Sequence, residues 1–361
     1  MDNNVASQGY GPVYFHNRTK QLVRWIPEGA YALIEHKDID EMAALALIDK
    51  NVKGVLNYAP SMSGDYPSLG TIRLIEHGVP VYDIDDPQRV KQVLRQGHTI
   101  HIDGRQLWLK EPQGPSFLSS LTRYTDRDIL LKLKLAQANL KDRLQKFVEN
   151  TLTYALQELP EILQPVPIPK LKLNMRDRHV VVVTRGSGYM EDLMAIKDYI
   201  AEVQPVLIGV DGGADAILEC GLKPHLIFGD MDSISHTALC SGAEIVVHAY
   251  KTGQAPGLNV VHRLGISAHI FPCFGTSEDA AHLLADEAGA RLIVSVGSHT
   301  HMLDFLEKGR QGMASTLLVR MKLGGKLVDA KGIHHLCLRK PHSRISSPLS
   351  VSDACLEHHT H

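Results

Sequence analysis

The sequence has little of what disulfide-bonded, membrane-spanning or nucleic-acid-binding proteins need. Its five cysteines are an odd number and none forms a Cys-x-x-Cys pair, which fits a reducing cytoplasm better than a disulfide framework. No run reaches the ~18–20 apolar residues that cross a bilayer, and the first residues, MDNNVASQGYGP, lack the segments of a signal peptide. The net charge of -2, with acids and bases mixed along the chain, gives no basis for a nucleic-acid partner. The sequence therefore predicts a cytoplasmic protein.

The length and the apolar content point to two folded domains. The chain has 361 residues, of which 44% are hydrophobic and 22% charged, an ordinary globular profile. We expect a small α/β domain over residues 1–115, a long helix and proline-rich linker over 116–175, and a second α/β domain over 176–338. The polar segment 339–361 shows no hydrophobic period and is left out of the fold prediction.

The first domain is predicted from short apolar runs and helical spacing. Asp38 is expected to cap a helix, Asp103-Gly104 predicts a hairpin turn, and residues 1–15 are expected to be loose. The predicted strands cover 30–35, 54–58 and 79–83, and the predicted helices cover 39–50, 69–77 and 88–95. This order resembles the swivelling phosphohistidine domain of phosphoenolpyruvate-utilising enzymes. No histidine lies at the matching loop, so that resemblance implies no activity.

One long helix is predicted over residues 126–159. Its apolar residues recur every three or four positions, at Leu133, Ala136, Leu140, Leu144, Val148, Leu152, Ala155 and Leu159. At ~1.5 Å per residue such a helix spans ~50 Å, which is long for a small domain. It either packs along the protein's own body or forms a seam with a second copy, and we expect a homodimer. Proline at 160, 165, 167 and 169 is expected to end the helix.

Beyond residue 179 strands and helices alternate, which predicts a parallel sheet of five or six strands covered on both faces. The strand candidates cover 179–184, 205–210, 226–228, 244–249, 269–271, 291–296 and 326–329, and the predicted helices cover 190–203, 277–287 and about 302–321. Two of its predicted strands end in acidic turns, Asp211-Gly212-Gly213 and Gly229-Asp230-Met231-Asp232-Ser233. Ligands bind beyond the carboxyl ends of strands in such sheets, and closely spaced carboxylates suit Mg²⁺ shared with phosphates. The alternative is that these are ordinary turns, in which Asp and Gly are common.

The stretch 205–233 resembles the catalytic domain of thiamine pyrophosphokinases, and GTSEDAAHLLADEAGARLIVSVG, DFLEKGRQGMAST and KLVDAKG resemble the SteA-like proteins of the bacterial cytokinetic ring. The resemblance implies an α/β fold, a Rossmann-like parallel sheet preceded by a small α/β domain and a long connecting helix. It implies ATP or another nucleotide with Mg²⁺, and cell-division proteins as partners. The implied catalytic and metal-binding residues are Asp211, Asp230, Asp232 and Asp279. The implied cofactor-binding residues are Arg185, Gly212, Gly213, Gly229, Ser233, Gly275, Thr276 and Ser277.

The sequence also departs from the kinase pattern. The family's K-D-x-T-D motif is replaced by Gly275-Thr276-Ser277-Glu278-Asp279, and only Asp304 remains of its R-x-D-H motif. Asp279 can equally serve as a helix cap. The paired histidines, such as His299 and His301, are interpreted as ordinary solvated or core-edge side chains. These departures favour a non-catalytic or weakly catalytic nucleotide-binding scaffold in cell division, cytoplasmic or held at the membrane by partners. The alternative is a Mg²⁺-dependent thiamine diphosphokinase.

Overall fold

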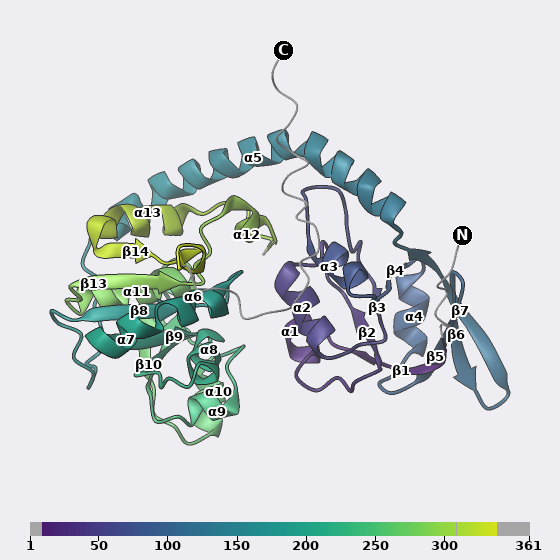
Figure 1. The fold of residues 1–361 in the computed structure, drawn as a ribbon, viewed down its shortest axis with the longest axis horizontal. Coiled ribbons are helices and arrows are strands. Elements are labelled where there is room, and N and C mark those ends of the chain that lie inside the picture. The colour runs from purple at the N-terminus through teal and green to yellow at the C-terminus, as the bar shows by residue number, and fades with distance from the viewer. Residues whose placement is uncertain (1–8, 308, 338–361) are drawn as a thin grey trace, which may run out of the picture.

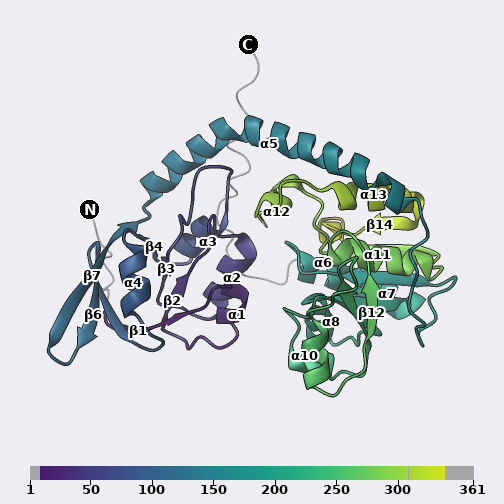
Figure 2. The same cartoon turned by 180° about the vertical axis from the view of Figure 1, so that it is seen from behind.

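The computed structural model describes residues 9–307 and 309–337. Two bodies lie side by side beneath one long helix, α5 (Asp126–Ile162), which spans both of them in the two opposite views of Figures 1 and 2. We refer to residues 9–125 as the barrel body and to residues 175–337 as the sheet body. In the part of the chain that the structure describes, no helix is long and apolar enough to span a membrane.

The barrel body is a closed barrel of seven strands in the order β1-β2-β3-β4-β7-β6-β5. The pairs among β1, β2, β3 and β4 are parallel, and the pairs that complete the ring are antiparallel. The strands are β1 (Gly11–Phe15), β2 (Tyr31–Ile34), β3 (Gly54–Asn57), β4 (Val81–Ile84), β5 (Thr99–Asp103), β6 (Gln106–Glu111) and β7 (Gly114–Arg123).

The predicted fold class, a Rossmann-like parallel sheet preceded by a small α/β domain, is therefore wrong. Two strands that the sequence did not predict close the ring. The long β7 pairs with both β4 and β6, and β1, in a stretch expected to be loose, pairs with both β2 and β5. A closed sheet has no free edge strand, so every strand of this body gains a partner on each side.

Alternating side chains give the barrel two apolar faces. Tyr31, Leu33 and Leu56 belong to one buried cluster with residues of β5, β6 and β7. Their neighbours Ala32 and Val55 belong to another, together with the helices outside the ring. The helices outside the ring are α1 (Thr19–Leu22), α2 (Glu41–Asp49) and α3 (Gly70–Glu76), and α4 (Pro87–Val93) flanks the barrel. This alternation follows the period-two geometry of a strand.

Asp40, rather than Asp38, caps helix α2. The Asp40 carboxylate accepts a hydrogen bond from the Ala43 amide at 2.7 Å. Asp38 has a left-handed backbone, with φ 53°, and its carboxylate accepts from the amide and the hydroxyl of Ser63 at 2.6 and 2.8 Å. It therefore anchors the loop after β3, whose hydroxyls serve as turn hydrogen bonders, as Ser61 also does toward Asp83.

Helix α5 confirms the helix predicted over residues 126–159 and extends three residues further. Thr125 and Asp128 form a reciprocal capping box at its start. Pro160 lies inside the last turn, where a proline removes only its own amide bond and few residues follow. Ile162 then packs into the core of the sheet body, which holds the last turn in place.

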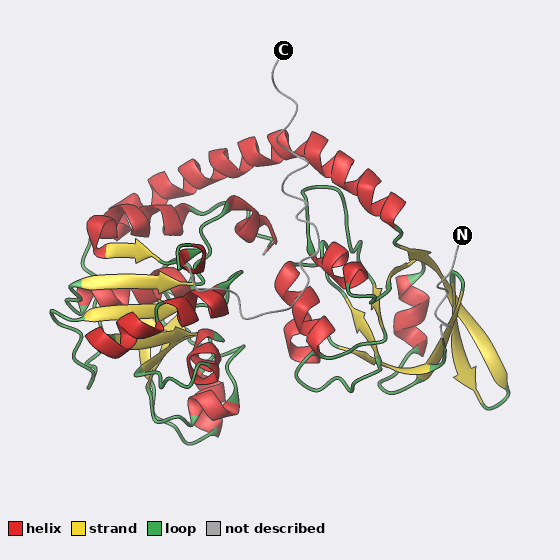
Figure 3. Ribbon diagram, in the orientation of Figure 1, coloured by secondary structure: helices red, strands yellow, loops and turns green. Residues whose placement is uncertain are grey.

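The sheet body holds seven parallel strands in the order β12-β11-β10-β9-β8-β13-β14, one or two more than predicted (Figure 3). The chain enters at β8, extends to one side through β12, and returns to the other side of β8 with β13 and β14. The strands are β8 (His179–Val183), β9 (Val206–Val210), β10 (Leu226–Gly229), β11 (Glu244–Ala249), β12 (His269–Pro272), β13 (Leu292–Val296) and β14 (Leu327–Asp329).

Helices cover the sheet, as predicted for a parallel sheet. One core includes Val180, Val182 and Ile208 with residues of α11 and α13, and another includes Val181 and Val183 with residues of α6, α7 and α8. The helices predicted at 190–203 and 302–321 are each divided in two. The helical segments are α6 (Tyr189–Ala195), α7 (Lys197–Val203), α8 (Gly213–Glu219), α9 (His236–Leu239), α10 (Leu258–Arg263), α11 (Ser277–Glu287), α12 (Met302–Glu307), α13 (Ala314–Leu323), η1 (Gly324–Lys326) and η2 (Ile333–His335).

Candidate functional site

Asp211 and Asp230 meet at the carboxyl ends of the neighbouring strands β9 and β10. The Asp230 amide donates a hydrogen bond to Asp211 Oδ1 at 3.0 Å. Asp211 has a left-handed backbone, with φ 49°, and Gly229 has φ 146°, which favours glycine. A Cβ on Gly229 would lie 2.0 Å from Asp211 Oδ1, so a glycine is required for this approach. The two turns predicted as a site are therefore built to bring these carboxyls together.

The electrostatics of this pair are unusual for carboxyl groups. Burial raises the pKa of Asp211 to about 7, and the adjacent Asp230 carboxylate adds to the rise, while Lys20 of the barrel body opposes it. At neutral pH Asp211 is therefore close to half protonated. A bound cation would remove the repulsion between the two groups.

Asp232 faces the barrel body instead of the other two acids. Arg18, at the start of α1, forms an ion pair with its carboxylate. Gln21 donates to the Asp232 carbonyl at 2.8 Å, and Arg24 donates to the Ile234 carbonyl at 3.2 Å. The Asp232 amide also donates to Asp230 Oδ1 at 3.0 Å. The turn at residues 229–233, which we call the acidic turn, is thus a contact point between the two bodies. The sequence did not predict this contact.

Arg185, predicted to contact phosphate, lies beside the Asp211-Gly212 turn. Its guanidinium donates to Glu219 Oε1 at 2.9 Å, but its Nε is buried and has no hydrogen-bond partner among the residues that the structure describes. A Cβ on Gly212 would lie 3.2 Å from that Nε, and one on Gly213 would lie 1.9 Å from the Val183 carbonyl oxygen. Gly213 is therefore needed for β8 and α8 to approach this closely, whereas Gly212 leaves room for the Arg185 side chain.

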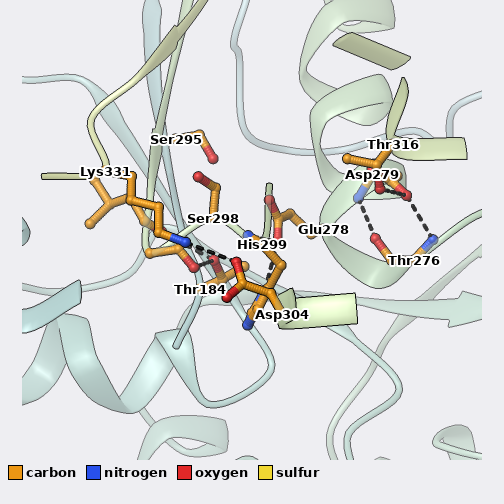
Figure 4. Close-up of polar contacts among 12 residues, drawn as sticks. Thr184, Thr276, Glu278, Asp279, Ser295, Ser298, His299, Asp304, Thr316 and Lys331 are labelled. Atoms are coloured by element: carbon orange, nitrogen blue, oxygen red, sulfur yellow. Dashed lines mark hydrogen bonds and ion pairs between the residues drawn. The ribbon is translucent and has the colours of Figure 1, made fainter. Parts of the chain in front are cut away.

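Asp279 serves as a helix cap. Its carboxylate accepts from the Thr276 amide at 3.1 Å, and the Asp279 amide donates to Thr276 Oγ1 at 3.0 Å, which completes a capping box (Figure 4). Ser315 and Thr316 of α13 donate to the same carboxylate oxygen, Oδ2, at 2.8 and 3.0 Å. The carboxylate therefore ties the start of α11 to α13.

The other predicted ligands fall into two groups. Gly229 and Ser233 belong to the acidic turn, whereas Gly275 and Ser277 lie with Thr276 at the start of α11. His248 of β11 lies near both groups. Its Nδ1 is 3.3 Å from the Ser277 hydroxyl oxygen, and the carboxylates of Asp230 and Asp279 are close enough to affect its pKa. Burial lowers the pKa of His248, and these two acids only partly oppose that effect. Among the described residues, no three of His, Cys, Asp and Glu lie close enough together to hold a metal ion, and the ligand roles of all these residues stay predictions.

A second polar cluster, missed by sequence reasoning, lies at the carboxyl ends of β13 and β14 (Figure 4). His299 donates from its amide to Glu278 Oε2 at 3.2 Å, and its Nδ1 lies 3.0 Å from the same oxygen. Burial alone would raise the pKa of Glu278, but the hydrogen bonds and charge of His299 outweigh it and lower that pKa. Lys331 pairs with Asp304 at 2.8 Å, and Ser298 donates to Asp329 at 2.7 Å.

This cluster borders the β8–β13 boundary, where the strand order reverses and where ligands bind in open α/β sheets. Its residues come from three stretches of the chain: Glu278, the stretch from Ser298 to Asp304, and the stretch from Asp329 to Lys331. The closest local signal is the His299-Thr300-His301 pair, for which the sequence favours solvated or core-edge side chains. The order of the strands in the sheet brings these residues together, and the hydrophobic periodicity of the sequence does not predict that order.

Comparisons with known proteins give little beyond a weak structural likeness. No family model matches the chain, and no curated protein matches it. Thiamine pyrophosphokinase from Bacillus subtilis matches with 19% identity and a TM-score of 0.26, over 42% of this chain and 60% of that one. 3-Isopropylmalate dehydratase (leuD) from Methanocaldococcus jannaschii matches with 11% identity and a TM-score of 0.24, over 36% of this chain and 96% of that one. The likeness is structural and weak. It carries no argument about activity.

Proposed function

We propose that this protein is a nucleotide- or phosphate-binding scaffold, non-catalytic or weakly catalytic, of the SteA-like class in bacterial cell division. The observation that carries the phosphate part is Arg185 Nε, a buried donor that lacks a partner among the described residues and lies beside Gly212. A buried donor without a partner is costly. A phosphate oxygen would satisfy it with a charge-assisted hydrogen bond.

Asp211 and Asp230 fit a magnesium ion shared with that phosphate. Mg²⁺ is usually held by one or two carboxylates, with phosphate oxygens and water completing its coordination. The Asp211 pKa of about 7 reflects burial and the repulsion between its carboxylate and that of Asp230. A divalent cation bound between the two carboxylates would remove this repulsion. When bound, Mg²⁺ would neutralise charge on the phosphates.

Binding is better supported than group transfer. Asp279, expected from the resemblance to be a metal ligand, is held by Thr276, Ser315 and Thr316. Asp304 is held by Lys331. Phosphoryl transfer depends on charge neutralisation and positioning, and these two acids are already committed to structural contacts.

The role in cell division rests on the sequence motifs that resemble the SteA-like proteins. We place the protein in the cytoplasm, with any attachment at the division site made through partner proteins. The contact of Arg18 with Asp232 supports a scaffold, because a ligand or Mg²⁺ at the acidic turn would compete with Arg18. The occupancy of the site would then alter the contact between the two bodies.

The second candidate is a Mg²⁺-dependent thiamine diphosphokinase. It is favoured by the intact acidic turns, whose Asp211 and Asp230 carboxyls meet at one strand edge. Production of thiamine diphosphate from ATP and thiamine by the pure protein would favour this candidate over the scaffold.

Calorimetric titration with ATP and GDP, with and without Mg²⁺, tests the proposal. We expect Mg²⁺-dependent binding in the wild-type protein and at least about tenfold weaker binding when Asp230→Asn is combined with Arg185→Ala. Asp142→Asn, on the exposed surface of α5, is the matched control and should leave binding unchanged. Equal Mg²⁺-dependent binding in the double variant would remove this site from consideration.

A further inference from the structure

A cavity of about 330 Å³ lies between the two bodies, beneath the middle of α5. Four parts of the chain line it. The barrel body contributes Lys37 and Asp65, α5 contributes Lys146 and Phe147, α12 contributes Leu306, and the segment after α12 contributes Arg310. The volume is at the lower end of the range for small-molecule pockets.

Hydrogen bonds from α5 hold the walls of this cavity on both sides. Toward the barrel body, Asn139 donates to the Gly64 carbonyl at 3.0 Å, and Arg143 pairs with Asp65 at 2.6 Å. Toward the sheet body, Asn150 donates to the Gln311 carbonyl at 3.1 Å. Contacts from α5 to both bodies therefore fix the walls of the cavity.

The cavity has a net positive lining, because it is lined by the cations Lys37, Arg143, Lys146 and Arg310 against the carboxylates Asp38 and Asp65. Both carboxylates already have partners. Asp38 accepts two hydrogen bonds from Ser63. Asp65 accepts from Lys37 at 2.7 Å and pairs with Arg143, and the Lys37 hydrogen bond is the largest cause of its lowered pKa. Lys146 and Arg310 have no ion pair or side-chain hydrogen bond to any side chain that the structure describes.

We propose that this cavity binds a small diphosphate-bearing molecule, with Lys146 and Arg310 as its cationic ligands. Lysine and arginine are the usual ligands of phosphate groups, and here they project from α5 and from the sheet body. Phe147 and Leu306 give the cavity an apolar wall against which an aromatic base can pack. This site is separate from the acidic turn and uses no divalent cation.

The test is calorimetric titration with inorganic pyrophosphate and with ADP in buffer containing EDTA, which removes any contribution of Mg²⁺. We expect saturable binding that weakens as salt is raised. Combining Lys146→Ala with Arg310→Ala should weaken it at least about tenfold. Because both side chains are exposed, the variant is expected to keep the wild-type melting temperature. The matched control combines Lys134→Ala with Arg127→Ala, exposed residues of α5 that do not line the cavity.

The arms of the experiment separate the possible ligands and the two sites. Tighter binding of ADP than of pyrophosphate identifies a nucleotide that uses the apolar wall, and equal binding identifies the diphosphate group alone. Asp230→Asn should leave this binding unchanged, which separates it from the site at the acidic turn. No saturable binding in the wild-type protein, or equal binding in the Lys146 and Arg310 double variant, would overturn the proposal.

Discussion

At the scale of single residues, buried ionisable groups distinguish this protein. Asp211 is held against Asp230 by the geometry of Gly229, and Glu278 is held in its charged form by His299. His282 is fully buried on α11, where its Nε2 lies 3.1 Å from Ser295 Oγ. Each of these groups links the protonation of the chain to the stability of its fold.

Stability should fall as the pH drops below about 6.5, the usual pKa of histidine. Burial lowers the pKa of His282, and also that of His225 and His248. The unfolded chain therefore takes up these three protons before the folded chain does, and the free energy of unfolding decreases with falling pH. Asp211, whose raised pKa makes the folded chain take up its proton first, opposes this effect as one group against three. Each fully buried histidine contributes at most ~1.4 kcal/mol per pH unit.

The effect can be measured by urea unfolding at several pH values between neutral and mildly acidic. His282→Gln, which can still bond Ser295, should make the pH dependence shallower. Replacing the exposed His77 by Gln should not change it. A slope that is identical in wild type and His282→Gln would contradict the buried, neutral imidazole.

The residues of the acidic turn could be predicted from the sequence because they are local. Asp211 directly follows the apolar strand β9, Asp230 directly follows β10 with Asp232 two residues beyond it, and parallel strands end at one edge. Two things could not be predicted. The partner of Asp232 comes from Arg18 in the other body, and the Glu278–His299 pair depends on the strand order.

At the scale of elements, the difference between local sequence signals and contacts between distant residues explains which segments could be predicted. The helix α5 has a strong local period and most strands of the sheet body are continuous apolar runs, and their predicted positions are confirmed to within a few residues. The strand β7 combines serines and glycine with few apolar residues, and β1 begins with Gly11 and Pro12. Their strand character depends on partners elsewhere in the barrel, which no local window contains.

Helix α5 should mediate a homodimer through its exposed leucines. Val148, Leu152, Leu156, Leu159 and Leu163 follow one another every three or four residues, and Leu152 and Leu156 are 54% and 73% exposed. An apolar stripe of this kind is typical of a contact surface. Light scattering at tens of micromolar should give the mass of a dimer.

Leu152→Glu combined with Leu156→Glu should convert that dimer to a folded monomer. Leu131→Glu combined with Leu135→Glu, which are 56% and 48% exposed near the other end of the helix, should leave it dimeric. A monomeric mass for the wild-type protein would show that this stripe is not a self-association surface.

At the scale of the whole molecule, the two bodies touch at the acidic turn through Arg18, Gln21 and Arg24. Both partners of the ion pair are partly exposed, and such pairs contribute little to stability. The contact is therefore weak enough for a ligand to displace it.

Arg18→Ala should strengthen binding of Mg²⁺-nucleotide at the acidic turn by about two- to fivefold, because Asp232 loses its competing cation. Calorimetry measures this change, and Arg127→Ala, on exposed α5, is the matched control. Weaker binding in Arg18→Ala would show instead that Arg18 is itself a ligand of the phosphate.

The pairing of β1 with β5 also constrains how the chain folds during its synthesis on the ribosome. The barrel cannot close until Gly11 and Pro12 meet Ile100 and Thr99 and until β7 has joined β4 to β6. Such non-local pairing slows folding, so β1 keeps one unpaired edge until β5 (Thr99–Asp103) has left the ribosome. The sheet body instead starts from its interior strand β8 and adds β9, β10, β11 and β12 in order. Nascent chains arrested shortly after residue 100 should therefore depend most on chaperones.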